Sequence, residues 1–127
     1  MKKKILGSSL LVLLLSITQV LVSQAFAEEN NIKTMAHIMI NLNHYPSDSE
    51  KETLRQISLK STNSYEKTMA TAMMNLEHAA TAEDKKNLSK ILQDDAAPED
   101  VKTLAKIIHD LNHKPSADDK KKLESMM

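Results

Sequence analysis

The chain has 127 residues, with 17 basic and 17 acidic side chains, one glycine and no cysteine. The lack of cysteine excludes disulfide frameworks and thiolate metal sites, and the balanced charge offers no large one-signed surface for nucleic acid. Scarce glycine together with abundant Ala, Leu, Met, Lys and Glu predicts an all-α fold.

The first 27 residues have the layout of a secretory signal peptide. Three lysines at 2–4 precede an apolar stretch at 5–22, and Ala25-Phe26-Ala27 supplies small residues at a cleavage site. An uncleaved anchor is the alternative, because this mostly apolar stretch of 18 residues approaches the length that spans a bilayer. We favour cleavage after Ala27, which leaves a single domain at 28–127 with 14 basic and 17 acidic residues. The mature protein is then expected to be periplasmic or secreted, and not attached to a membrane.

Two helices are expected in the first third of the mature chain. Apolar residues recur with helical spacing over 32–44, which predicts an amphipathic helix. Tyr45 precedes Pro46 and is therefore disfavoured in helical geometry. Ser47 followed by Glu50 predicts a capping box that starts a second helix, ending near Lys60 with Leu59 as one of its inward positions.

Four further helices follow by the same reasoning. Helical spacing predicts a third helix over 65–78, capped by Asn63, and a fourth that starts after Thr81. Pro98 suits the first position of a fifth helix, whose apolar spacing continues to Leu111. Ser116 is expected to cap a sixth helix, whose inward residues are Leu123, Met126 and Met127.

These helices form three tandem hairpins with a repeat of about 34–35 residues. Leu42, Leu76 and Leu111 occupy equivalent positions. Tetratricopeptide repeats have the same length, but their glycine and large aromatic residues are missing here, and we assign no family. The hairpins are expected to form either a compact bundle or a short solenoid, and we favour the compact bundle because no polar capping repeat is evident.

Histidine recurs once per repeat, at His44, His78 and His113, next to the predicted end of each first helix. The interpretation we favour from sequence is a helix-end role, in which the ring bonds a free carbonyl near the negative end of the helix dipole. The alternative is that the three imidazoles converge as metal ligands. His109 and His113 form a second candidate pair, because a spacing of four places both on one helical face.

Methionines also recur with helical spacing, at Met35, Met39, Met69 and Met73. Thioether and imidazole together suit copper(I). However, the third repeat has Leu104 and Ile108 at the equivalent positions, so we interpret these methionines as core residues.

Nothing in the sequence groups side chains for catalysis, so no enzyme is predicted. The function we favour is a small exported helical repeat protein that acts as a non-catalytic binding module, with another protein or a second copy of itself as partner and without a cofactor. The alternative is a periplasmic metal-handling protein of the copper type, which uses His109 and His113, or histidine and methionine side chains at the hairpin ends, His44 and His78 among them, as ligands.

Overall fold

The computed structural model describes residue 27 and residues 30–127. The predicted signal peptide and its cleavage site therefore lie almost entirely outside the described residues. None of the helices in the described part is both long and apolar enough to cross a membrane. The account below concerns the compact unit at 31–127.

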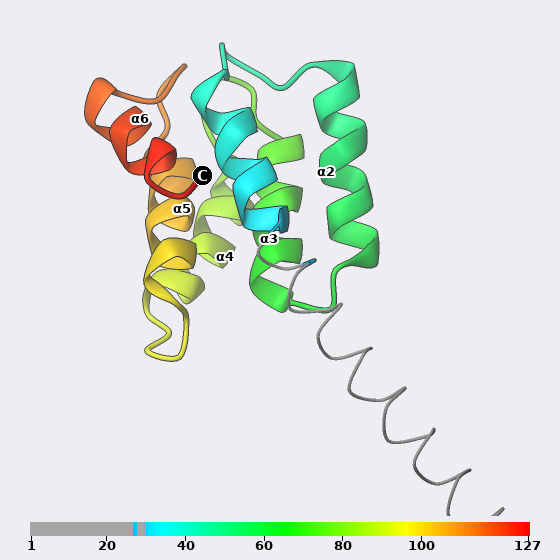
Figure 1. The fold of residues 1–127 in the computed structure, drawn as a ribbon, viewed down its shortest axis with the longest axis vertical. Helices are drawn as coiled ribbons and strands as arrows, with labels where there is room; N and C mark the ends of the chain where they lie inside the picture. Colours follow the sequence, from blue (N-terminus) through cyan, green and yellow to red (C-terminus); the bar gives the residue numbers. More distant parts are fainter. Residues whose placement is uncertain (1–26, 28–29) are drawn as a thin grey trace, which may run out of the picture. The chain divides into compact units, whose positions relative to one another are not determined.

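The described part of the chain is all-helical, as predicted, and contains six helices. The first helix covers 30–40. The others, labelled in Figure 1, have the following bounds: α2 Asp48–Lys60, α3 Ser64–Met74, α4 Ala82–Leu92, α5 Glu99–Asp110 and α6 Ala117–Glu124.

Side-chain caps begin four of the helices at the predicted residues. Ser47 and Glu50 form a reciprocal capping box at α2. The side chains of Asn63, Thr81 and Ser116 accept hydrogen bonds from backbone amides at the starts of α3, α4 and α6. Pro98 occupies the N-cap of α5 and not its first helical position, so this helix begins at Glu99, one residue later than predicted.

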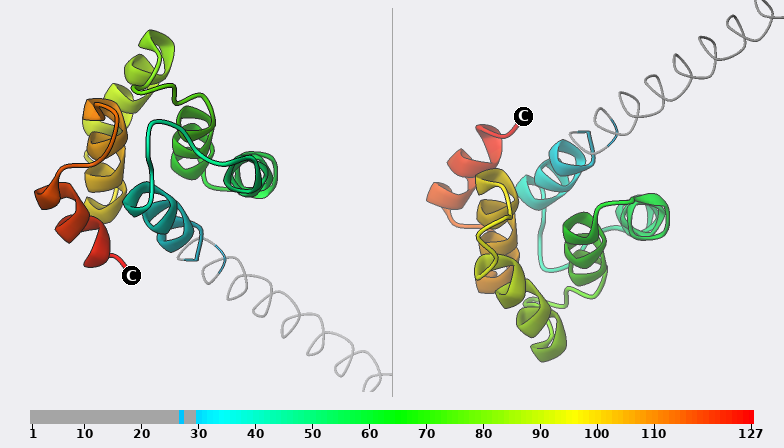
Figure 2. Two further views of the ribbon diagram at one scale, coloured as in Figure 1. Left: turned by 90° about the horizontal axis from the view of Figure 1, so that it is seen from above. Right: turned by 90° about the horizontal axis from the view of Figure 1, so that it is seen from below.

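The hairpins close into a compact bundle and do not extend as a solenoid. Figure 2 shows the first helix, α3 and α5 around a common centre, with α2, α4 and α6 outside them. α2 packs against α3, and α4 packs against α5. In Figures 1 and 2, α6 lies beside the first helix, so the outer helices alternate with the inner ones around the whole unit.

The inward faces of the three inner helices form most of the core, and the outer helices add Leu54, Ile57, Leu88, Ile91 and Leu123. Met35, Met39, Met69 and Met73 are completely buried, as are Leu104 and Ile108 at the equivalent positions of the third repeat. This confirms the interpretation of these methionines as packing residues. Two inward assignments were wrong: Leu59 is 63% exposed and Met127 is 53% exposed, because both lie at the ends of their helices or beyond.

Candidate metal site

All three inner helices end before the histidine that the sequence placed within or next to them. The first helix ends at residue 40, α3 at Met74 and α5 at Asp110. The predicted end of the third helix at residue 78 was therefore wrong by four residues. In each repeat a buried leucine, an exposed residue and then the histidine follow the helix.

His44, His78 and His113 share an unusual backbone conformation, with φ angles of 73°, 71° and 66°. These are the positive-φ residues other than glycine in the described part of the chain. A side chain in this left-handed region costs roughly 1–2 kcal/mol, and histidine is among the residues that tolerate it better than most. Three such residues at equivalent positions indicate that one specific turn is repeated three times.

Hydrogen bonds between the repeats hold these turns together. The backbone N–H of His44 donates to the carbonyl of His113 at 2.8 Å, that of His113 donates to His78 at 2.7 Å, and that of His78 donates to His44 at 2.9 Å. The three bonds form a closed ring. Each repeat thus gives one donor and one acceptor to the other two, which pairs backbone groups that lie outside the helices.

The ring of backbone bonds brings the three imidazoles into contact. The Nδ1 atoms of His44 and His78 are 3.0 Å apart, those of His78 and His113 are 3.0 Å apart, and those of His44 and His113 are 3.2 Å apart. The ring centroids are farther apart, at 4.8, 4.9 and 5.2 Å, and the ring planes are inclined by 69–84°. The rings therefore diverge outward from three Nδ1 atoms that point at one centre.

Hydrogen bonds alone cannot account for all three contacts between the Nδ1 atoms. An uncharged imidazole nitrogen carries either a hydrogen or an in-plane lone pair, so it donates or accepts but does not do both. Among three nitrogens at least two must be of the same kind, and at least one of the three contacts then joins two donors or two acceptors. A cation at the centre resolves the conflict, because all three nitrogens can present lone pairs to it.

The dimensions of the triangle suit a transition-metal ion. An ion at the usual zinc–imidazole distance of about 2.0–2.1 Å from each nitrogen lies about 1 Å outside their plane. The angles between ligands are then close to 97°, between the octahedral value of about 90° and the tetrahedral value of about 109°. His78 and His113 are exposed and His44 is half-buried, so solvent reaches the cluster. These three residues form a possible metal-binding group in the described part of the chain.

The predicted pair of metal ligands His109 and His113 required both residues to lie on one face of the fifth helix, and the structure does not have this arrangement. α5 ends at Asp110, so the spacing of four residues does not put His113 on its face. The Nδ1 of His109 instead lies 2.7 Å from an oxygen of Asp110. Hydrogen bonds from Lys106 and from His109 lower the pKa of the Asp110 carboxyl group. His109 is thus engaged locally and is not part of the cluster, whereas His113 is joined by His44 and His78.

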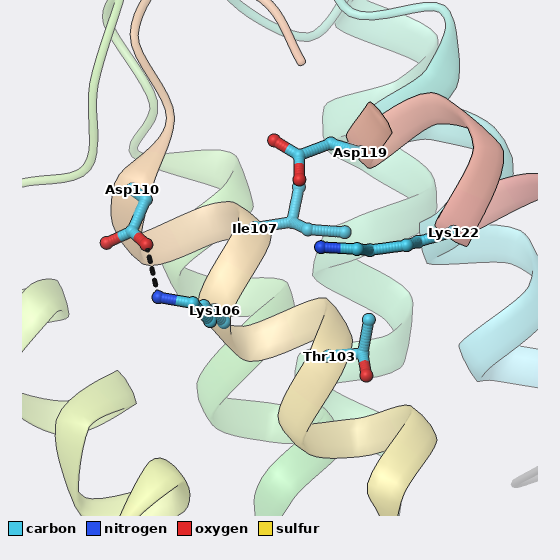
Figure 3. Close-up of a pocket in the computed structure, with 6 residues that line it drawn as sticks. All are labelled: Thr103, Lys106, Ile107, Asp110, Asp119 and Lys122. Carbon is cyan, nitrogen blue, oxygen red and sulfur yellow. Dashed lines mark hydrogen bonds and ion pairs between the residues drawn. The ribbon is translucent and has the colours of Figure 1, made fainter. Parts of the chain in front are cut away.

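A polar hollow also lies between α5 and α6 (Figure 3). The side chains of Lys106 and Asp110 form an ion pair there at 2.8 Å. Asp119 and Lys122 reach the same hollow from α6. Its acids and bases balance one another, so it presents no charge that would select a ligand.

No family model, curated protein or solved structure matches this chain. Functional inference for this protein therefore rests on the geometry of the site.

Proposed function

We propose that this protein binds one divalent transition-metal ion through the Nδ1 atoms of His44, His78 and His113. The observation that carries the proposal is the triangle of Nδ1 atoms, with sides of 3.0, 3.0 and 3.2 Å. Hydrogen bonds cannot satisfy all three of these contacts at once. Each ligand comes from a different repeat, and the closed ring of backbone hydrogen bonds supports the arrangement before any ion arrives.

The ligand set favours zinc(II) and copper(II) among the available ions. Neutral imidazole suits zinc, copper, nickel and iron, and intrinsic affinity rises along the first-row series to copper(II). Copper(I) is less favoured, because the four methionines that recur with helical spacing, Met35, Met39, Met69 and Met73, are completely buried in the core and cannot serve as ligands at the cluster. From the predicted signal peptide we infer that this metal-binding protein is exported.

Calorimetric titration of the purified protein with zinc(II), and separately with copper(II), tests the proposal. We expect one ion per chain and a loss of affinity of at least 100-fold in His44→Asn, His78→Asn and His113→Asn, since each removes one of three ligands. His37→Asn is the matched control, because His37 is exposed on the first helix and bonds only locally to Asn41. Equal binding in the cluster variants and the control would refute the proposal.

A further inference from the structure

The surroundings of the histidine cluster are asymmetric, although the cluster itself is close to threefold. The residues that precede the histidines are Asn43, Glu77 and Asn112, and those that follow are Tyr45, Ala79 and Lys114. On one flank a hollow of about 300 Å³ opens beside His78, lined also by Tyr45, Lys51 and Glu77. Tyr45 and Glu77 differ from their counterparts in the other repeats, whereas Lys51 has a lysine counterpart in each of them, Lys85 and Lys120.

An ion held by three nitrogens on one side has coordination positions left on the other. Sites with three histidine ligands keep at least one position for water or for an exogenous ligand. The hollow is lined by His78, one of the three proposed ligand residues, so a molecule bound in the hollow contacts a residue of the histidine cluster.

The hollow also presents a cation. The Lys51 ammonium group lies 5.8 Å from the centroid of the Tyr45 ring, within the range of a cation–π contact. This contact holds the ammonium at the wall that Lys51 and Tyr45 share. A ligand that is drawn to both the metal ion and Lys51 must be an anion with at least two separated acceptor atoms, which a carboxylate provides.

We propose that a carboxylate group is the additional ligand of this site, with one oxygen on the metal ion and the other facing Lys51. This inference rests on the proposed function, because it requires the ion held by His44, His78 and His113. Glu77 lines the same hollow and is exposed. Its negative charge opposes the ligand, so the hollow favours a monoanion over a dianion.

Cobalt(II) is the probe that tests this inference, because its visible absorption reports the number and kind of its ligands. The cobalt-loaded protein is titrated with acetate, and we expect a saturable change in the cobalt spectrum. At full cobalt loading, Lys51→Met is expected to weaken acetate binding by about three- to tenfold, and Glu77→Gln to strengthen it by a similar factor. Lys86→Met is the matched control, because Lys86 is exposed on α4 and does not line the hollow.

Each outcome separates the two proposals. Failure to bind cobalt overturns the metal site itself. Cobalt binding without any response to acetate overturns only the carboxylate inference. A stoichiometry of one cobalt ion per two chains also overturns the carboxylate inference, because a second copy of the protein then fills the open coordination positions of the ion. Equal acetate affinities in Lys51→Met and Lys86→Met overturn the role of Lys51.

Two sources of carboxylate are distinguished in the same experiment. A short peptide with a free C-terminal carboxylate is compared with the same peptide as its C-terminal amide. Binding of the acid form with at least the affinity of acetate supports a peptide ligand, whereas binding of acetate alone supports a free small acid. An equal spectral response to both peptides shows that the carboxylate is not what is recognised, and overturns the inference.

Discussion

Metal binding should stabilise the folded protein strongly, because the site exists only when all three repeats are assembled. His44 and His78 are 34 residues apart, and His44 and His113 are 69 residues apart. The unfolded chain therefore offers no preformed site. With free zinc at 100 times its dissociation constant, the free energy of unfolding should rise by about 2.7 kcal/mol. For a domain of this size, that corresponds to a rise of roughly 10–20 °C in melting temperature.

The informative variant is His78→Asn, measured by thermal unfolding followed with circular dichroism, in excess zinc and in excess chelator. Asparagine tolerates the φ of 71° at this position, whereas alanine would add a backbone penalty of about 1–2 kcal/mol. We therefore expect His78→Asn to melt near the wild-type temperature in chelator and to lose the stabilisation by zinc. His109→Asn should keep the full stabilisation, because His109 is not part of the cluster.

The reasoning is refuted if His78→Asn keeps the zinc-dependent rise in melting temperature. It is also refuted if His109→Asn loses the rise to the same extent, since the ligands would then be the pair predicted from the helical spacing.

Three further predictions concern the fold. Met73→Leu should cost less than about 1.5 kcal/mol in denaturant unfolding and Met73→Ala about 2–5 kcal/mol, because the side chain is completely buried; equal costs would contradict its role in packing. Ser47→Ala should cost about 0.5–2 kcal/mol, since it removes the hydroxyl that accepts a hydrogen bond from the backbone amide of Glu50; an unchanged denaturation midpoint would argue against this cap. The Tyr65 hydroxyl donates to Asp94 at 2.7 Å, and this bond, followed by one from the amide of Ala96, lowers the pKa of Asp94. Tyr65→Phe should therefore lower the melting temperature near pH 7, and lower it less as the pH falls through the depressed pKa of Asp94; a pH-independent effect would refute this origin.

Much of the fold could be predicted from sequence, because its causes are local. Ser47, Asn63, Thr81 and Ser116 start helices by bonding amides two or three residues away, and those spacings are visible in the sequence. The equivalence of Met73 with Ile108 likewise identified a core position without a structure.

The site could not be predicted in the same way, because it depends on contacts between repeats. In a solenoid the three histidines would stand in a row, whereas in a closed bundle equivalent residues near the axis meet. The sequence does not fix that choice. The apolar spacing also continues past the true ends of α3 and α5, which concealed the left-handed turns at His78 and His113. One signal was present: histidine is retained in all three repeats, while the residue after it is different in each, Tyr45, Ala79 and Lys114.

The buried carboxylate of Glu66 was also missed. It is 1% exposed and accepts hydrogen bonds from Ser61 at 2.6 Å and from Asn31 at 2.8 Å. The sequence shows Glu66 only as a first-turn acid, which the helix dipole explains equally well for an exposed residue. Glu66 is buried because the first helix packs beside α3, where Asn31 bonds to it. This contact joins two different repeats, so local sequence patterns do not reveal it.

The cyclic order of the backbone bonds among the three histidine turns has a consequence for protein engineering. Because His44, His78 and His113 each donate to one neighbour and accept from the other, no repeat is first or last in the ring. The connections around 61–63 and 93–98 join one hairpin to the next without taking part in that ring. Severing them should turn a single polypeptide into three separate hairpins that can still satisfy the same bonds. A peptide of one repeat, made with a uniform sequence, is therefore a template for a small homotrimer with its histidines on a true threefold axis.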